Sequence, residues 1–410
     1  MPLSPERKNY FAIMSMIGSG HAMSHFYLLA LPPLFPLLKT EFDVSYAALG
    51  LLITGLNASS ALSQIPAGLL VDRIGARKVL IFGLSIAGLS VAAIGAAPSY
   101  IVVLVLITLA GVGNSVLHPC DYAILNASVD PKRVGRAFAV HTFSGNIGFT
   151  LAPMTMALLS VSFGWRAALV IVGLFVLIIV AALIRFGSLL VDEKTLRERE
   201  AKLDTSGSQN PPDTGLRPLL SPVILVMFLF FMCSAMVTSG VQSFSVTALI
   251  GHQEIGLGEA NTVLTAFLVA SSLGVLLGGP LADKTTRHGT LAASAMIGGA
   301  ILFAVIGSVG LGVALLIICF AGVGIMQGAV RPSRDMMVRA VTPKGASGRV
   351  FAFVSTGLNV GAAITPVLFG YLIDIGRPET VFYLLAFILT LSIATIGVAR
   401  SRKPVPAPAE

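Results

Sequence analysis

The stretch "VLIFGLSIAGLSVAAIGAA", Val79–Ala97, contains apolar and small residues and carries no charge. A helical run of this length crosses the roughly 30 Å hydrocarbon core of a bilayer, because each residue rises about 1.5 Å. The stretch "ALVIVGLFVLIIVAALI", Ala168–Ile184, has the same character. Neither stretch alternates apolar and polar residues as the strand of a membrane barrel does. Both therefore predict membrane-spanning helices.

The composition extends this prediction to the whole chain. Its 410 residues are 55% hydrophobic and 11% charged, whereas soluble domains carry about 25% charged residues. Breaking the chain at its polar loops gives about twelve helices, so we predict an all-α membrane protein. The N-terminal "MPLSPERKNYF" lacks a signal-peptide cleavage site, which indicates that the first apolar run is retained. The cysteines lie inside apolar runs and show neither a disulfide framework nor a metal-binding spacing: Cys120, Cys233 and Cys319.

One long polar stretch divides the chain into two halves of six helices each. We predict an N-terminal bundle at 1–187, a cytoplasmic linker at 188–221, a C-terminal bundle at 222–402 and a cytoplasmic tail at 403–410. The first part of the linker favours a short amphipathic helix. Its second part is rich in Ser, Gly and Pro, which is typical of a flexible connection.

The two halves repeat each other. Residues 118–153 align with residues 331–366 at a constant offset of 213 (332 − 119), and six identical residues coincide: Pro119 with Pro332, Gly135 with Gly348, Arg136 with Arg349, Phe138 with Phe351, Asn146 with Asn359 and Pro153 with Pro366. Such repeats predict two bundles related by a pseudo-twofold axis along the membrane normal, with a binding site between them.

Basic residues set the predicted orientation. If the N-terminus is cytoplasmic, nearly all Lys and Arg outside the spans fall on the cytoplasmic side, and the other side keeps only Lys39, Arg166 and Arg377. The positive-inside rule then places both termini in the cytoplasm of a multi-pass protein. We expect the bacterial inner (plasma) membrane, and the net charge of +8 indicates topology rather than nucleic-acid binding.

Two loops carry a shared motif. "GLLVDRIGARKVL" begins at Gly68 and "GPLADKTTRHGTL" begins at Gly279; each has Asp four residues after Gly, followed by basic residues. The first loop closely resembles the signature loop of the major facilitator superfamily. The second resembles it more loosely, because Thr286 stands where a glycine is expected. With twelve helices and a central linker, the resemblance covers the whole chain.

The resemblance implies a cytoplasmic gate. In that superfamily the loop Asp contacts the start of a helix in the other half, where the helix dipole favours an anion. Here Asp72 is expected near Arg349, and Asp283 near Arg136. The alternative is a solvated turn whose basic residues only set topology. The candidate gating residues are Asp72, Arg73, Arg77, Arg136, Asp283, Asp335 and Arg349.

The fourth and fifth helices show a finer similarity. "GVGNSVLHP", Gly111–Pro119, and "GRAFAVHTFSGNIGFTLAP", Gly135–Pro153, resemble the matching region of fosmidomycin-resistance-type exporters. Asp121 lies one position later than the acid of that family, and the basic residue that follows it is absent. The substrate is therefore not carried over. The antiporter pattern of the fifth helix is present only as "GFTLAP", which favours export slightly.

Ionisable residues inside the spans are candidate functional residues, because burying them in a membrane is costly. His21 and His25 share one helix face and could bind substrate or carry a proton, as histidine titrates near neutral pH. The alternative is a neutral buried histidine bonded to a helix carbonyl or to Ser24. His118, Asp121 and His141 form a second group, and Asp121 is a further candidate proton carrier.

Arginines of the tenth helix form the third group. Arg334 aligns with Asp121, which predicts a gate pair, and Arg331 aligns with His118. Because neighbouring helical residues point about 100° apart, Asp335 is expected to pair with Arg331 or Arg339 rather than Arg334. The guanidinium groups favour an anionic organic substrate. The alternative is an ion-pair network between the fourth and tenth helices. Candidate neutral residues of the pathway are Asn57, Asn146, Gln242, Gln327 and Asn359, although Asn146 and Asn359 could equally serve helix packing.

These features predict a secondary active transporter working by alternating access. The chain lacks the Gly-x-x-x-x-Gly-Lys-Ser/Thr loop of nucleotide binding, so we expect proton-coupled exchange, with export favoured. Alternatives are an uptake permease for an organic acid, a non-transporting sensor and a membrane enzyme. His118 and Asp121 lack a second ligand pair, so we expect no metal. We also expect no cofactor and no nucleic-acid partner, and a monomer that acts on a small molecule and protons in the lipid bilayer.

Overall fold

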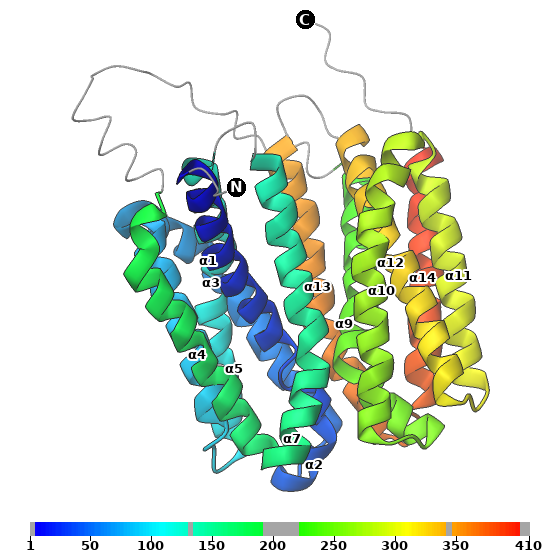
Figure 1. Cartoon of the computed structure of the whole chain (residues 1–410). Helices are drawn as coiled ribbons and strands as arrows, with labels where there is room; N and C mark the ends of the chain where they lie inside the picture. Colours follow the sequence, from blue (N-terminus) through cyan, green and yellow to red (C-terminus); the bar gives the residue numbers. More distant parts are fainter. Residues whose placement is uncertain (1–4, 130–133, 192–220, 342–346, 402–410) are drawn as a thin grey trace, which may run out of the picture. The chain divides into compact units, whose positions relative to one another are not determined.

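The computed structural model describes residues 5–129, 134–191, 221–341 and 347–401. These residues are almost entirely helical and include no strand. They divide between two compact units, one with Met1–Val44 and Leu51–Pro211, the other with Ser45–Gly50 and Pro212–Glu410. Figure 1 shows the long helices of each unit side by side. The prediction of an all-α membrane protein is confirmed.

The first unit contains seven α-helices in the described residues. Proline and glycine set several boundaries: Pro32 and Pro33 begin a short 3-10 helix after α1, and Gly75, with φ 93°, separates α3 from α4. Only glycine adopts such an angle readily. The helices are α1 (Pro5–Leu28), α2 (Phe35–Phe42), α3 (Tyr46–Ile74), α4 (Ala76–Ile94), α5 (Tyr100–Asn114), α6 (Leu117–Ser128) and α7 (Val134–Phe186), with 3-10 turns at Pro32–Leu34 and Gly187–Leu189.

The second unit contains six further helices, and α3 contributes its first residues to it. Pro222 opens α9, where the Ser221 hydroxyl accepts a hydrogen bond from the backbone N–H of Ile224 at 3.3 Å. Pro at the first helical position and Ser at the cap both favour a helix start. The helices are α9 (Pro222–Gln253), α10 (Leu257–Lys284), α11 (His288–Ser308), α12 (Val313–Val341), α13 (Ser347–Asp374) and α14 (Glu379–Ser401).

The helices account for about twelve membrane spans, as predicted. Ten helical segments of the described residues are long and apolar enough to cross a membrane. One of them, Val140–Leu189, holds two spans, because Gly164 has φ 82° and ψ 154° and breaks α7. The 24-residue α1 supplies the remaining one. The span Tyr100–Leu125 is interrupted at Ser115 and Val116, so its C-terminal half forms the separate helix α6.

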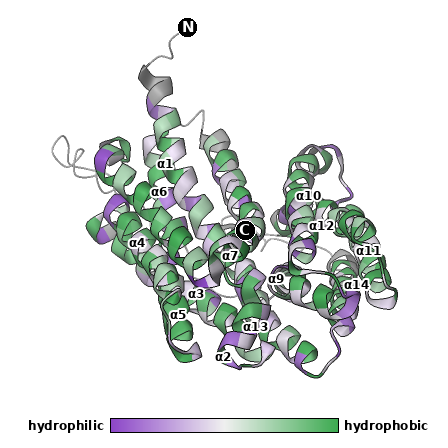
Figure 2. Cartoon of the chain, turned by 60° about the horizontal axis from the view of Figure 1, so that its bottom comes forward, coloured by the Kyte–Doolittle hydropathy of each residue, from purple (hydrophilic) through white to green (hydrophobic). Residues whose placement is uncertain are grey.

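Large apolar side chains lie exposed along these helices. Val161 is 84% exposed and Leu62 is 79% exposed, and Figure 2 shows hydrophobic residues along most helices of both units. A water-soluble protein rarely exposes contiguous apolar patches of this extent. The exposed apolar surface is the one that a bilayer covers.

The predicted repeat reappears in how each unit packs. In the first unit α1 packs on α7, and in the second α9 packs on α13. Gly148 of α7 lies so close to α1 that an added Cβ would stand 2.0 Å from the carbonyl oxygen of Ala22. Gly361 of α13 follows at the repeat offset, and its Cβ would stand 2.3 Å from the carbonyl oxygen of Met232. Both units therefore depend on glycine for the same close helix approach.

Several predicted features fall outside the described residues. The linker predicted at 188–221 is described only at its two ends, and the tail predicted at 403–410 is not described. The helix boundaries around residues 130–133 and 342–346 are likewise outside the description. The predicted domain limits therefore stay predictions.

Candidate functional site

Four histidines gather inside the first unit. His21 and His25 come from α1, His118 from α6 and His141 from α7. The rings of His21 and His141 stack, with centroids 3.7 Å apart and planes 12° apart. The His21 centroid lies 4.4 Å from that of His25 and 5.3 Å from that of His118. We call these four residues the histidine cluster; His21 and His141 are each only 2% exposed.

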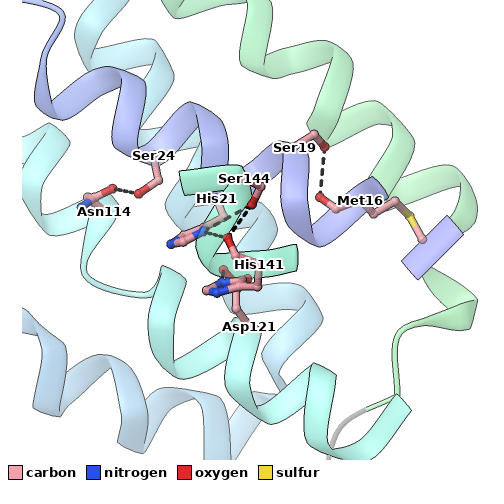
Figure 3. A network of polar contacts seen from close by, with 8 residues as sticks. All are labelled: Met16, Ser19, His21, Ser24, Asn114, Asp121, His141 and Ser144. Carbon is pink, nitrogen blue, oxygen red and sulfur yellow. Dashed lines mark hydrogen bonds and ion pairs between the residues drawn. The ribbon is translucent and has the colours of Figure 1, made fainter. Parts of the chain in front are cut away.

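Hydrogen bonds fix two of these rings. Nδ1 of His21 donates to the carbonyl oxygen of His141 at 2.8 Å, and Nε2 of His141 lies 2.9 Å from Oδ2 of Asp121. The Ser144 hydroxyl donates to the same carbonyl at 2.7 Å (Figure 3). Asp121 is fully buried, and its Oδ1 has no hydrogen-bond partner among the described residues. His141 therefore holds both neighbours, His21 through its backbone and Asp121 through its side chain.

A second polar contact of α1 lies beside the histidine cluster. The Ser24 hydroxyl donates a short hydrogen bond to Oδ1 of Asn114 at the end of α5 (Figure 3). Of the two alternatives weighed for His21, the bond to a helix carbonyl is thus the one present, and Ser24 bonds elsewhere. Asn114, Ser24 and Ser144 carry no sequence signal beyond being small polar residues inside apolar runs.

Gly145 leaves room for the imidazoles of α1. A Cβ at this position would lie 2.7 Å from Cε1 of His21 and 2.8 Å from Cε1 of His25. Real Cβ atoms essentially never come so close to another atom. Any other residue at position 145 would displace both rings, so the cluster depends on a glycine that the sequence analysis did not single out.

A polar stripe follows α12 in the second unit. Gln327, Arg331 and Arg334 recur at intervals of four and three residues, which places them along one side of the helix. Gln327 is 4% exposed, and its Nε2 has no hydrogen-bond partner among the described residues. The guanidinium of Arg334 lies over the ring of Phe231, 4.1 Å from its centroid.

The prediction that Asp335 does not pair with Arg334 is wrong. Nε of Arg334 donates to Oδ1 of Asp335 at 3.2 Å, although adjacent helical residues point apart. The arginine side chain is long and flexible enough to reach the carboxylate of its neighbour. The Arg334 side chain is 13% exposed and the Asp335 side chain is 51% exposed. Arg334 and Asp121 thus each have a partner within their own unit. The gate pair between them stays a prediction.

Of the other candidate gating residues, Arg77 has a defined role in the first unit. Its Nε and NH2 groups donate to the carbonyl oxygens of Leu183 at 3.3 Å and Ile184 at 2.7 Å, near the C-terminal end of α7. A cation there complements the helix dipole. Arg73 is exposed. The remaining predicted side chains of the gate are outside the described ones: Asp72, Arg136, Asp283 and Arg349.

The predicted neutral residues belong to both units, Asn57 and Asn146 to the first and Gln242, Gln327 and Asn359 to the second. Asn57 donates to the carbonyl of Ile53 on its own helix at 3.0 Å. Asn146 and Gln242 are half-buried, and Asn359 is exposed. Asn146 directly follows Gly145, the glycine that packs against the histidine cluster.

Comparison with known proteins agrees with this architecture. A sequence profile of the Major Facilitator Superfamily matches residues 17–258 and 236–410. The chain is 25% identical over 406 residues to the uncharacterized MFS-type transporter YfnC of Bacillus subtilis (strain 168), covering 96% of this chain and 94% of that protein. It is 24% identical over 403 residues to the fosmidomycin resistance protein of Escherichia coli (strain K12), with the same coverage of both chains.

A solved structure shares the fold. The crystal structure of a bacterial homolog of the human lysosomal transporter Spinster, in an inward-facing and occupied conformation, superposes with a TM-score of 0.77 at 16% identity, over 100% of both chains. The relatives and the fold are those of transporters rather than enzymes, as predicted. The profile, the helices and the signature loop lead to one assignment: the chain belongs to the major facilitator superfamily and is a multi-pass membrane transporter.

Proposed function

We propose that this transporter moves a small organic anion across the bacterial inner membrane by alternating access, in exchange for protons and in the direction of export. Both termini would lie in the cytoplasm, and a monomer would suffice. In alternating access the two halves rock around a central site that opens to each side in turn. The polar stripe of α12 supports the anionic substrate, and the resistance named in the Escherichia coli relative supports export.

The charge balance of α12 carries the proposal of an anion. Between Gln327 and Asp335 the helix has two arginines and a single acid, and that acid is bonded to Arg334. Asp335 also lies near enough to Arg331 to act on it electrostatically, so one acid is shared between the two arginines. A guanidinium in this position suits a carboxylate or phosphonate, to which it can donate two parallel hydrogen bonds. The free Nε2 of Gln327, one turn away, is a further donor.

We expect Arg331→Gln to weaken the handling of an anionic substrate at least tenfold, since a hydrogen bond to a charged group contributes about 1.5–3 kcal/mol. A thermal-shift screen of organic carboxylates, phosphonates and siderophore-like ligands at two pH values would first identify a binder. Uptake of that compound into proteoliposomes then gives kcat/KM. Arg377→Gln, in the exposed turn before α14, is the matched control and should transport normally. Transport by Arg331→Gln at the wild-type rate would refute the anion site.

Proton exchange predicts that an imposed pH gradient drives transport of the same compound. The measurement is accumulation in proteoliposomes with a pH step of either sign, compared with vesicles made permeable to protons. Exchange requires that substrate and protons move in opposite directions, whereas an uptake permease would move them together. If a pH gradient neither drives nor follows transport, the coupling ion is not the proton.

A further inference from the structure

The histidine cluster contains the donor set of a metal site. His21, His118 and His141 each offer one ring nitrogen, and these three atoms all lie within 4.8 Å of one another. They come from three different helices, α1, α6 and α7, of the first unit. We propose that these three residues bind one divalent transition metal ion, with Zn²⁺ the favoured ion. Imidazole nitrogen is a preferred ligand of Zn²⁺, and three histidines with one open position form a known type of zinc site.

The hydrogen bonds leave the right ring nitrogens available. A carbonyl oxygen only accepts, so Nδ1 of His21 bears the hydrogen and Nε2 keeps its lone pair. That Nε2 has no partner among the described residues, and the same holds for the buried Nδ1 of His118. Buried polar atoms without a partner are uncommon in proteins. His21 and His118 therefore each keep one buried ring nitrogen that no hydrogen bond among the described residues occupies.

Asp121 prepares the third ligand. Its carboxylate lies 2.9 Å from Nε2 of His141, so Nε2 donates and the lone pair is on Nδ1. Histidines that bind metals almost always donate their other N–H to a carboxylate or carbonyl in this way. Both arrangements occur here, the carboxylate at His141 and the carbonyl at His21. Asp121 also supplies a negative charge that partly offsets that of the cation.

Binding requires a limited movement of the rings. Zinc–nitrogen bonds of 2.0–2.1 Å place tetrahedral ligand atoms about 3.3 Å apart, closer than the present upper limit of 4.8 Å. The stacked rings of His21 and His141 have parallel planes, so at least one must rotate to aim its lone pair at a shared ion. His118 is only half-buried, and Gly145 presents no side chain against His21. The half-buried ring of His118 is therefore the one most able to turn, and the absence of a side chain at position 145 removes one obstacle to His21.

The inference does not depend on the proposed substrate or on proton coupling, and it departs from the expectation of no metal. A core of histidines without ligand function would explain their burial. It would not explain why three ring nitrogens lie within 4.8 Å of one another while two of the rings are held by hydrogen bonds. An ion at this position would also connect α1, α6 and α7 to one another.

The test is a titration of the full-length purified protein, with any tag removed and metals stripped by a chelator. Co²⁺ is the probe, since its visible absorption reports four-coordinate nitrogen ligation, and mass spectrometry counts Zn²⁺ bound after gel filtration. We expect one ion per chain. His118→Gln should weaken binding at least tenfold, and Asp121→Asn, which keeps the side-chain volume, by about 10–100-fold. Zn²⁺ should raise the Tm of the wild type but not of His118→Gln.

The matched control is His252→Gln. His252 lies in the second unit, where its Nε2 donates to the carbonyl of Ile306 at 3.1 Å, and its replacement should leave the Co²⁺ spectrum and stoichiometry unchanged. The proposal is overturned if the wild type binds less than a stoichiometric amount of Co²⁺, which needs no variant to fold. It is also overturned if His118→Gln binds as tightly as the wild type, or if His252→Gln loses the ion equally.

Discussion

Replacing His141 with leucine is expected to destabilise the first unit by about 3 kcal/mol, because it leaves a buried carboxylate oxygen without its hydrogen-bond donor. The carboxylate of Asp121 is fully buried, and His141 is its hydrogen-bond donor at 2.9 Å. Without that donor, the polar oxygen would remain in an apolar interior with neither water nor a partner. For a unit of this size the change corresponds to a fall in Tm of about 10 °C, measured in metal-free detergent solution.

A double variant separates the pair from the shape of the side chains. His141→Leu combined with Asp121→Val removes both polar groups, and such replacements of buried pairs are often neutral. We therefore expect the double variant to recover most of the stability that His141→Leu loses. A double variant less stable than the single one would mean that packing, rather than the unpaired carboxylate, causes the loss.

The second large effect is expected at the repeated glycines. Gly148→Ala would place a Cβ 2.0 Å from a backbone oxygen of α1, and Gly361→Ala would place one 2.3 Å from a backbone oxygen of α9. Backbone atoms cannot rotate away, so the helices must separate. Overpacking of this kind costs about 1–3 kcal/mol, only partly offset by the better helix propensity of alanine. We expect each variant to lower the Tm by several degrees.

Gly258→Ala is the matched control for both variants. Gly258 lies in the first turn of α10, and a Cβ there would meet no atom within 4 Å. Its replacement should leave the Tm unchanged or raise it slightly. Equal effects at Gly148 and Gly361 would also support the internal repeat, since both residues occupy the same position of it. If Gly148→Ala were as stable as the wild type, α1 and α7 would not pack as closely as described.

Much of the fold could be read from the order of residues along the chain. Spanning helices need only uninterrupted apolar runs, which are local in sequence, so Val79–Ala97 and similar stretches identified them directly. The signature loop at Asp72 is also a local pattern, and the repeat at an offset of 213 residues appears when the two halves are aligned. The loop indicated the superfamily to which the chain belongs. The division of α7 into two spans follows from the break at Gly164, whose φ of 82° and ψ of 154° are not helical.

The hydrogen-bond partners of side chains were less predictable, because they depend on the direction of each side chain and on how the helices pack. The angle between adjacent helical residues argued against an Arg334–Asp335 pair, yet the length and flexibility of arginine allow that bond. Asp121 has a partner that the sequence did not indicate, His141, twenty residues further along the chain on another helix.

The sequence by itself determined that this chain is a two-part helical membrane transporter with histidines and an acid inside its spans. Only the tertiary structure decided that His21, His118 and His141 lie together, with ring nitrogens within 4.8 Å of one another. The physical reason is that these residues are separated by 97 and 23 positions (118 − 21 and 141 − 118). Neither helical nor strand periodicity relates residues so far apart along the chain. The contact follows instead from how closely α7 approaches α1 at Gly145 and Gly148.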